Sequence, residues 1–280
     1  MGERTSYSPG TFCWVDLATS DVEGATAFYH RVLGWMPQDI PATVGVAYRT
    51  MHRDGHLVAA VSQMPESQRA SGAPPAWLAY VAVEDAALTA QRTEGLGGTV
   101  TAGPFDVADA GRAVMLRDPD GATLALWEAR AHTGAALVND PGALVLNQLN
   151  TPDPGAAEDF YTRLFGWTVF QAAIEPVPYW GIRNGDALNG GMMRLDEEGA
   201  GAHWLAYFSA EDLDLAAWTI ADAGGSVSVP ATRIESGRIL VATDPQGAAF
   251  ALPPPDDRAR GFDSPGVGEF SWHEVWVRTS

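Results

Sequence analysis

The sequence has no lysine, a single cysteine and few basic side chains. All 17 basic residues are arginine, which excludes chemistry that needs a lysine amine, such as Schiff-base formation. The lone Cys13 excludes an internal disulfide framework and a zinc site built from several thiolates. With 35 acidic residues the formal net charge is −18, which disfavours nucleic acid and anionic membranes as partners.

Long hydrophobic runs are also missing. No apolar stretch approaches the roughly 20 residues that a membrane span needs, and the start Met1-Gly2-Glu3-Arg4 does not read as a signal peptide. The composition is nevertheless globular, with 46% hydrophobic and 19% charged residues over 280 positions. We therefore expect a cytoplasmic protein of about two domains, each able to bury its own core.

The two halves of the chain repeat each other. A Phe-Tyr pair and a Gly-Trp pair in 27–35 recur in 159–167, where Phe160 follows Phe28 by 132 positions. Two further matches follow in the same order: Trp77-Leu78-Ala79-Tyr80 with Trp204-Leu205-Ala206-Tyr207, and Asp118-Pro119-Asp120-Gly121 with Asp244-Pro245-Gln246-Gly247. This predicts a duplication, whose parts are domains at 7–130 and 144–253, a linker at 131–143 and a C-terminal spacer and orphan strand at 254–280.

Each half divides again into two similar units. In the first unit, Asp21 is a typical helix N-cap residue after an apolar strand, and Gly34 ends the helical pattern. The expected strands are 12–18, 44–51, 57–63, 77–83, 99–105, 112–117 and 123–127, and the second expected helix is 86–96. The pattern predicts an α+β protein of four βαβββ units.

These motifs resemble the vicinal oxygen chelate superfamily, which includes glyoxalase I, extradiol dioxygenases and bleomycin-resistance proteins. The similarity covers roughly Tyr7 to Pro253 and implies two glyoxalase-like half-open barrels in tandem, each enclosing a site. It also resembles accessory proteins of actinobacterial aromatic polyketide (anthracycline) pathways. One fold hosts many functions, so the resemblance implies the architecture more strongly than the activity.

Enzymes of this family usually bind one divalent metal per barrel through His, Gln or Glu on the first and last strands of each unit. The resemblance places those positions on apolar residues here, namely Trp14, Leu78, Ala125, Leu146, Leu205 and Ala251. A metal needs three or four donors at once. We therefore predict a protein that binds no metal and requires no cofactor.

Three polar residues share the inward strand parity of those positions. Asp16 follows Trp14 by two positions, and it is either a buried structural carboxylate or a ligand anchor and general base with a raised pKa. Gln148 does not titrate and is expected to hydrogen-bond a ligand. His203 is the one inward histidine, and it is either a rim residue or a second candidate base. No catalytic residue is assigned beyond these two candidates, Asp16 and His203.

Aromatic residues are the other signal. Ten tryptophans are present, and a cavity lined by Trp, Tyr, Leu and Met suits a flat apolar ligand. Trp35, Trp167, Trp77 and Trp204 are expected to pack in the core instead. The expected ligand-binding set is Trp14, Asp16, Leu78, Tyr80, Ala125, Trp127, Gln148, Trp180, Met192, His203, Leu205 and Tyr207.

Three functions remain open at this point. The first is metal-independent binding of a planar aromatic antibiotic or polyketide, for self-resistance or to assist a pathway enzyme. The second is a metal-free cyclase, isomerase or hydroxylase-associated enzyme, and the third is a metal-dependent glyoxalase or dioxygenase. The expected partners are an aromatic small molecule and a pathway enzyme, with the chain a monomer or homodimer. Residues 264–274 echo 8–16. The C-terminal strand expected at 268–280 is therefore either an orphan strand that pairs with a sheet edge or a disordered vestige.

Overall fold

The structure is a computed structural model, and it describes residues 2–39, 48–172, 178–195, 201–234 and 237–255. The expected orphan strand at 268–280 and the first residues of the expected strand at 44–51 lie outside this part of the chain. No helix in the described residues is long and apolar enough to cross a membrane.

The first half contains two βαβββ units joined by the short helix α2 (Glu66–Ala70). The first unit comprises β1 (Phe12–Thr19), α1 (Val22–Leu33), β2 (Met36–Asp39), β3 (Tyr48–Arg53) and β4 (His56–Gln63). The second comprises β5 (Ala76–Ala82), α3 (Ala86–Gly95), β6 (Thr99–Val107), β7 (Gly111–Arg117) and β8 (Thr123–Ala129).

The second half repeats this order. Its first unit comprises β9 (Leu144–Thr151), α4 (Pro154–Phe165), β10 (Thr168–Gln171), β11 (Tyr179–Asn184) and β12 (Ala187–Arg194). Its second unit comprises β13 (His203–Phe208), α5 (Leu213–Asp222), β14 (Ser226–Ile234), β15 (Gly237–Thr243) and β16 (Ala249–Leu252). The predicted α+β class with four βαβββ units is confirmed, whereas the domain limits 7–130 and 144–253 stay a prediction.

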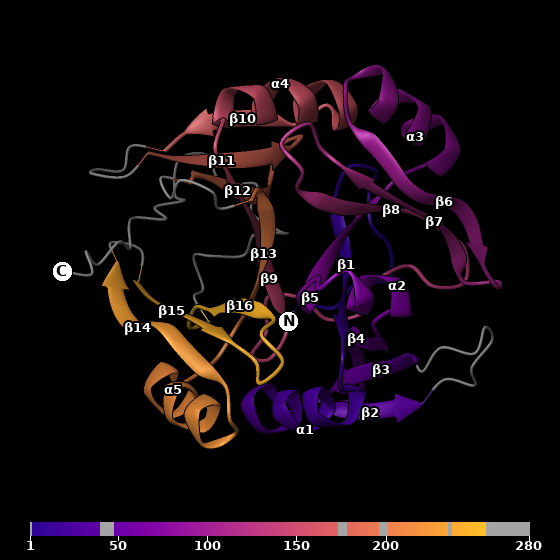
Figure 1. Cartoon of the computed structure of the whole chain (residues 1–280). Coiled ribbons are helices and arrows are strands. Elements are labelled where there is room, and N and C mark those ends of the chain that lie inside the picture. Colours follow the sequence, from indigo (N-terminus) through magenta and orange to yellow (C-terminus); the bar gives the residue numbers. More distant parts are fainter. Residues whose placement is uncertain (1, 40–47, 173–177, 196–200, 235–236, 256–280) are drawn as a thin grey trace.

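Each half forms one eight-stranded sheet. The strand orders are β2-β3-β4-β1-β5-β8-β7-β6 and β10-β11-β12-β9-β13-β16-β15-β14. The two units of a half therefore meet at their first strands, which pair antiparallel as β1 with β5 and as β9 with β13. Both sheets curve, and their concave faces look in opposite directions (Figure 1).

Local sequence explains where the helices begin. Four aspartates, Asp21, Asp85, Asp153 and Asp212, cap the four longer helices by accepting hydrogen bonds from backbone N–H groups of the first turn. Gly34 and Gly166 end α1 and α4 with φ of +70° and +76°, a left-handed conformation that glycine adopts without a side-chain clash. The repeated motifs therefore repeat their caps as well.

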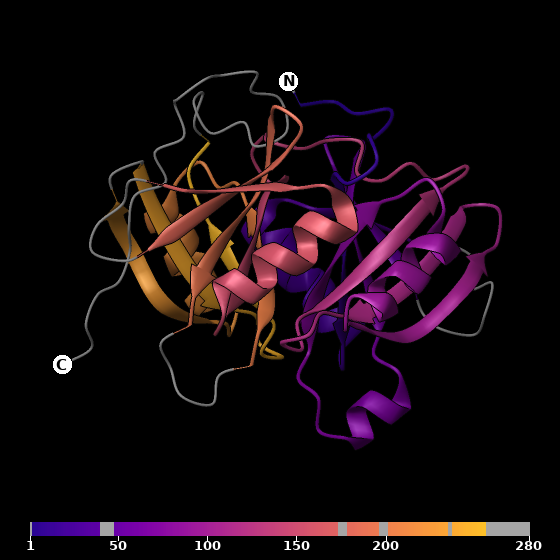
Figure 2. The same cartoon turned by 90° about the horizontal axis from the view of Figure 1, so that it is seen from above.

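The convex faces of the two sheets share one core with the four longer helices. Helix α1 lies beside α5, and α3 lies beside α4, so each helix pair joins the two halves (Figures 1 and 2). Aromatic side chains cross the boundary; the Phe12 and Trp204 ring centroids, for example, are 5.0 Å apart. Trp35 and Trp167 are fully buried in this core, and Trp77 and Trp204 pack in it too, as the sequence predicts.

Equivalent residues of the two halves make reciprocal hydrogen bonds across the shared core. The Tyr29 hydroxyl donates to Asp244 Oδ2 at 3.3 Å, and the Tyr161 hydroxyl donates to Asp118 Oδ2 at 2.9 Å. Each carboxylate also caps its own Asp-Pro turn, so the repeated turn motif anchors the opposite half. This exchange fixes the two sheets with their concave faces outward, where the candidate sites lie.

Candidate functional site

The concave face of the first half carries a cluster of buried aromatic side chains. Trp14, Tyr80 and Trp127 are 3%, 6% and 5% exposed. Strand pairing aligns Trp14 with Tyr80 and Tyr80 with Ala125, and alternation places their side chains on the same face of the sheet. Leu78 and Ala125 join this cluster. The structure therefore brings together all six residues that the sequence assigned to the first half, including Asp16.

Asp16 is the buried acid of this face. It is 9% exposed, and its Oδ2 accepts a 2.8 Å hydrogen bond from the Tyr80 hydroxyl. Burial raises the pKa of Asp16 to about 6, although the hydrogen bond from Tyr80 opposes that rise. The carboxyl group therefore changes charge near neutral pH, as a general acid or base requires.

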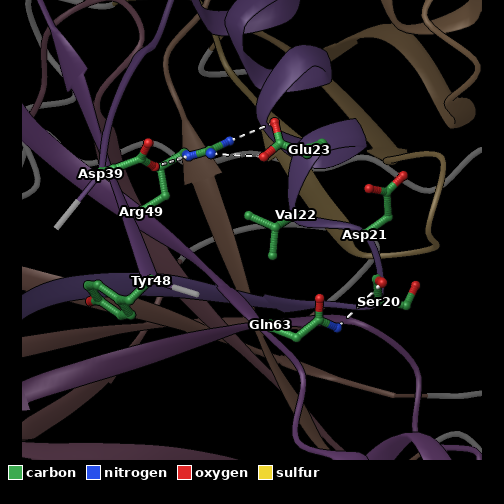
Figure 3. A pocket seen from close by; sticks show the side chains of 8 residues that line it. All are labelled: Ser20, Asp21, Val22, Glu23, Asp39, Tyr48, Arg49 and Gln63. Atoms are coloured by element: carbon green, nitrogen blue, oxygen red, sulfur yellow. Dashed lines mark hydrogen bonds and ion pairs between the residues drawn. The ribbon is translucent and has the colours of Figure 1, made fainter. Parts of the chain in front are cut away.

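A pocket of about 380 Å³ opens beside this cluster, at the start of α1 (Figure 3). Arg49 crosses its wall and pairs with Glu23 at 2.8 Å and with Asp39 at 2.7 Å. Tyr48 lines the pocket and also packs against the aromatic cluster, where its hydroxyl hydrogen-bonds with Trp14. Tyr48 therefore stands between the pocket and the buried acid. The full lining is Ser20, Asp21, Val22, Glu23, Asp39, Tyr48, Arg49 and Gln63.

His132 completes this face, although sequence reasoning left it in a linker. Its ring lies 4.7 Å from Trp14 and 5.6 Å from Trp127, centroid to centroid, edge-on to both. Burial lowers the pKa of His132, which favours a neutral imidazole. No local motif marks this residue, because only the return of the chain from β8 to β9 brings it over the indoles.

On its concave face, the second half carries a row of hydrogen-bonded polar side chains in place of Asp16. The Tyr207 hydroxyl donates to Gln148 Oε1 at 2.8 Å, and Gln148 Nε2 donates to Asn150 Oδ1 at 2.9 Å. Asn150 Nδ2 lies 3.2 Å from His203 Nε2. His203 is exposed at the start of β13, and its Nδ1 lies 2.9 Å from the Gly201 oxygen. The row thus runs from a rim histidine to a buried tyrosine beside Leu205.

Trp180 and Met192 are not on the concave face. They pair with each other, Met192 pairs with Leu149, and all three pack in the shared core. Their neighbours Tyr179 and Met193 take the concave positions instead, since side chains alternate along a strand. An error of one residue in the strand alternation moves every side chain of the hairpin to the other face. The sequence analysis made this error for Trp180 and Met192.

A divalent metal of the kind that the fold family implies does not fit these faces. The first-half residues Trp14, Leu78 and Ala125 have no side-chain atom that coordinates a metal ion. The same holds for Leu146 and Leu205 in the second half. Across the described ranges, no group of three or more His, Cys, Asp or Glu side chains could hold a metal ion. The chemistry these residues offer is therefore stacking, hydrogen bonding and proton transfer at Asp16.

Comparison with known sequences connects these faces to a family. A model of the glyoxalase/bleomycin resistance protein/dioxygenase superfamily matches residues 11–126 and 143–252. CFP32 of Mycobacterium tuberculosis is 39% identical over 255 residues, covering 90% of this chain and 97% of that protein. The anthracycline biosynthesis protein DnrV of Streptomyces peucetius is 32% identical over 262 residues, covering 89% of this chain and 94% of DnrV.

Solved structures show the same fold at lower identity. The 2,3-dioxygenase LapB from Pseudomonas sp. KL28 aligns with a TM-score of 0.63 at 15% identity, covering 96% of this chain and 99% of LapB. The Mn(II)-bound glyoxalase from Novosphingobium aromaticivorans aligns with a TM-score of 0.61 at 12% identity, covering 93% and 91%. By its repeated units, its sheet order and its full-length relatives, the chain belongs to the glyoxalase/bleomycin resistance protein/dioxygenase superfamily.

Proposed function

We propose that this protein binds a planar, mainly apolar aromatic molecule on the concave face of its first half. The observation that carries this proposal is the buried Asp16–Tyr80 pair among the indoles of Trp14 and Trp127. Among the described residues, the Asp16 carboxylate has no basic partner. A buried carboxyl without one costs folding free energy, so a role in ligand recognition accounts for its presence.

The ligand class follows from the chemistry of this face and from a relative. Indole and phenol rings stack on flat rings, and Asp16 can accept a hydrogen bond from a phenolic hydroxyl or an amine. DnrV carries the name of an anthracycline biosynthesis protein, and anthracyclines combine these features. We therefore propose an anthracycline-like polyketide, sequestered for self-resistance or presented to a pathway enzyme.

Quenching of tryptophan fluorescence tests this binding. Titration with daunomycin at micromolar concentration is expected to quench the emission to saturation. Trp14→Leu is expected to weaken that binding, and it is a mild change because Leu146 holds the equivalent place in the second half. If neither daunomycin nor other planar polyketides bind to the wild-type protein, the proposal fails.

We propose further that binding requires no metal, because the positions where the family resemblance implies metal ligands are apolar here. Metal analysis of protein purified without a chelator tests this directly. The expected content is far below one ion per chain, and daunomycin binding is expected to survive dialysis against a chelator. Stoichiometric Mn, Fe, Ni or Zn would contradict the proposal.

The titrating carboxyl supports a second candidate function, a metal-free enzyme with Asp16 as general acid or base. Its pKa of about 6 suits proton transfer near neutral pH, a contribution of roughly 10²–10⁴-fold. Asp16→Asn separates the two functions, because the amide keeps an acceptor for Tyr80 but does not titrate. Loss of turnover with retained binding supports an enzyme, whereas no turnover by the wild-type protein leaves a binding protein.

A further inference from the structure

Tyr179 in the second half is the structural equivalent of Tyr48 in the first. Asp16 pairs with Ala60 and Gln148 pairs with Gly191, which aligns β4 with β12. Two residues further along β4, Ser62 pairs with Tyr48, and two residues further along β12, Met193 pairs with Tyr179. Both tyrosines therefore occupy the same place on their concave faces.

The two hydroxyls differ in their partners. The Tyr48 hydroxyl hydrogen-bonds with Trp14, but the residue equivalent to Trp14 is Leu146, which has no donor. The Tyr179 hydroxyl is buried, with the residue 9% exposed, and no hydrogen-bond partner reaches it from the part of the chain that the structure describes. An unpaired buried hydroxyl is costly, and Leu146 offers it no hydrogen-bond donor in the place where the first half has Trp14.

Several positions on this face of the second half carry smaller residues than their equivalents in the first half. A side chain at Gly191 would come within 1.8 Å of the Tyr179 hydroxyl, so that hydroxyl lies directly over the glycine. The pairing of Gly191 with Gln148 places it close to the amide that the Tyr207 hydroxyl contacts. The position of Trp127 is taken by Pro253, since the Asp-Pro turns are offset by 126 residues. Two indoles that fill the first concave face are thus replaced by smaller groups.

Apart from the polar side chains of Gln148, Asn150 and His203, this face carries an apolar cluster. Its members are Val145, Leu146, Leu188, Leu205, Tyr207, Ile239 and Ala251, with Phe170 and Val241 at its margin. The charged Arg183 lies at the edge, with its guanidinium 4.8 Å from the Phe170 ring centroid and bonded to the Asp186 carbonyl. This environment favours an uncharged ligand with a polar atom at one point.

We propose that the concave face of the second half is a second binding site, for an uncharged, apolar ring molecule with a carbonyl oxygen that accepts a hydrogen bond from the Tyr179 hydroxyl. Tyr179 is then the residue that selects for the carbonyl. This site differs from the one in the first half, where an ionisable acid takes the polar role. The inference therefore does not depend on the function proposed above.

A matched pair of probes tests this site. Fluorenone and fluorene share three fused rings, but only fluorenone has a carbonyl oxygen. The wild-type protein is expected to bind fluorenone about tenfold more tightly, as one additional hydrogen bond implies. Tyr179→Phe is expected to bind both probes equally, and Leu146→Trp is expected to abolish binding at this site by filling it. Equilibrium dialysis measures each dissociation constant.

Two variants of the first half separate this inference from the proposed function. Tyr48→Phe changes the equivalent hydroxyl, and Trp14→Leu removes an indole proposed to stack on daunomycin. Fluorenone binding that falls with these variants, but not with Tyr179→Phe or Leu146→Trp, places the probe in the first half and overturns the inference. Unchanged discrimination in Tyr179→Phe overturns it as well. Thermal melting of each variant checks folding, and the probe pair on the wild-type chain remains informative if one variant is unstable.

Discussion

The Tyr80 hydroxyl donates a 2.8 Å hydrogen bond to Asp16, and in the equivalent place of the second half Tyr207 donates one of the same length to Gln148. The duplicated scaffold therefore presents the same donor to a carboxyl group in one half and to an amide in the other. Only the carboxyl titrates, so the first half changes its charge with pH at a point where the second half stays neutral.

Replacing Asp16 with asparagine is expected to stabilise the protein at high pH. Because burial raises its pKa from 3.8 to about 6, the folded state favours the protonated form. The stability from this group is fully present below pH 3.8 and is lost as the pH rises through about 6. Asp16→Asn changes the free energy of unfolding, and urea unfolding should show that this change is about 2 kcal/mol more stabilising at pH 8 than at pH 4. An effect that does not vary with pH would contradict the raised pKa.

The converse change, Gln148→Glu, is expected to give the second half a similar pH dependence. The new carboxyl group is buried in the place of a side chain that is 5% exposed, so ionisation opposes folding. The variant should lose about 1–3 kcal/mol of unfolding free energy at pH 8 relative to pH 4. Wild-type protein, unfolded in urea at both pH values, provides the baseline. Equal destabilisation at both pH values would indicate a packing defect instead.

Tyr179→Phe is expected to stabilise the ligand-free protein. The substitution removes a buried hydroxyl that has no partner among the described residues, and it keeps the ring that packs over Gly191. Removing such an unpaired hydroxyl should raise the free energy of unfolding by about 1 kcal/mol. Tyr161→Phe is the opposite case, because its hydroxyl donates to Asp118 and accepts from Trp204. That variant should lose about 1–3 kcal/mol, and thermal melting of both distinguishes the two environments. A loss of stability in Tyr179→Phe would mean that its hydroxyl has a partner.

Gly191→Ala is expected to disturb the second concave face. The added methyl would lie 1.8 Å from the Tyr179 hydroxyl, so the tyrosine must move from its place beside Gln148. Loss of fluorenone binding and a lower melting temperature should follow. Gly95→Ala is the control, because its methyl meets no atom within 4 Å and alanine favours the helical conformation. It should change stability by less than about 1 kcal/mol, and similar effects of the two variants would refute the role of this glycine.

Binary patterning and caps made most of the fold predictable. Asp21 and Gly34 set the limits of α1, and the repeats implied that the second half would follow the same plan. The exposed strand β2 and the short helix α2 were missed, because neither carries an apolar pattern. Period-2 alternation also placed Asp16 correctly on its strand face, since its distance from the helix cap fixes the count.

Strand alternation did not predict the side-chain face where no helix cap lies nearby to fix the count. Trp180 lies on a hairpin strand after residues 173–177, so its parity could not be counted from a cap, and it faces the shared core. His132 carries no motif at all, yet it lies edge-on to the Trp14 and Trp127 rings. Contacts between residues far apart in the sequence decided both positions.

The amino-acid order alone determined the duplication and the four units, because these depend on local spacing and on residue type. Only the tertiary structure decided that each pair of units shares one sheet. It also decided that the Tyr48 hydroxyl bonds with Trp14, whereas the Tyr179 hydroxyl has no partner among the described residues. Hydrogen-bond partners and burial depend on strand register and on packing between residues far apart in the sequence. They can therefore not be predicted for a single residue from its local sequence.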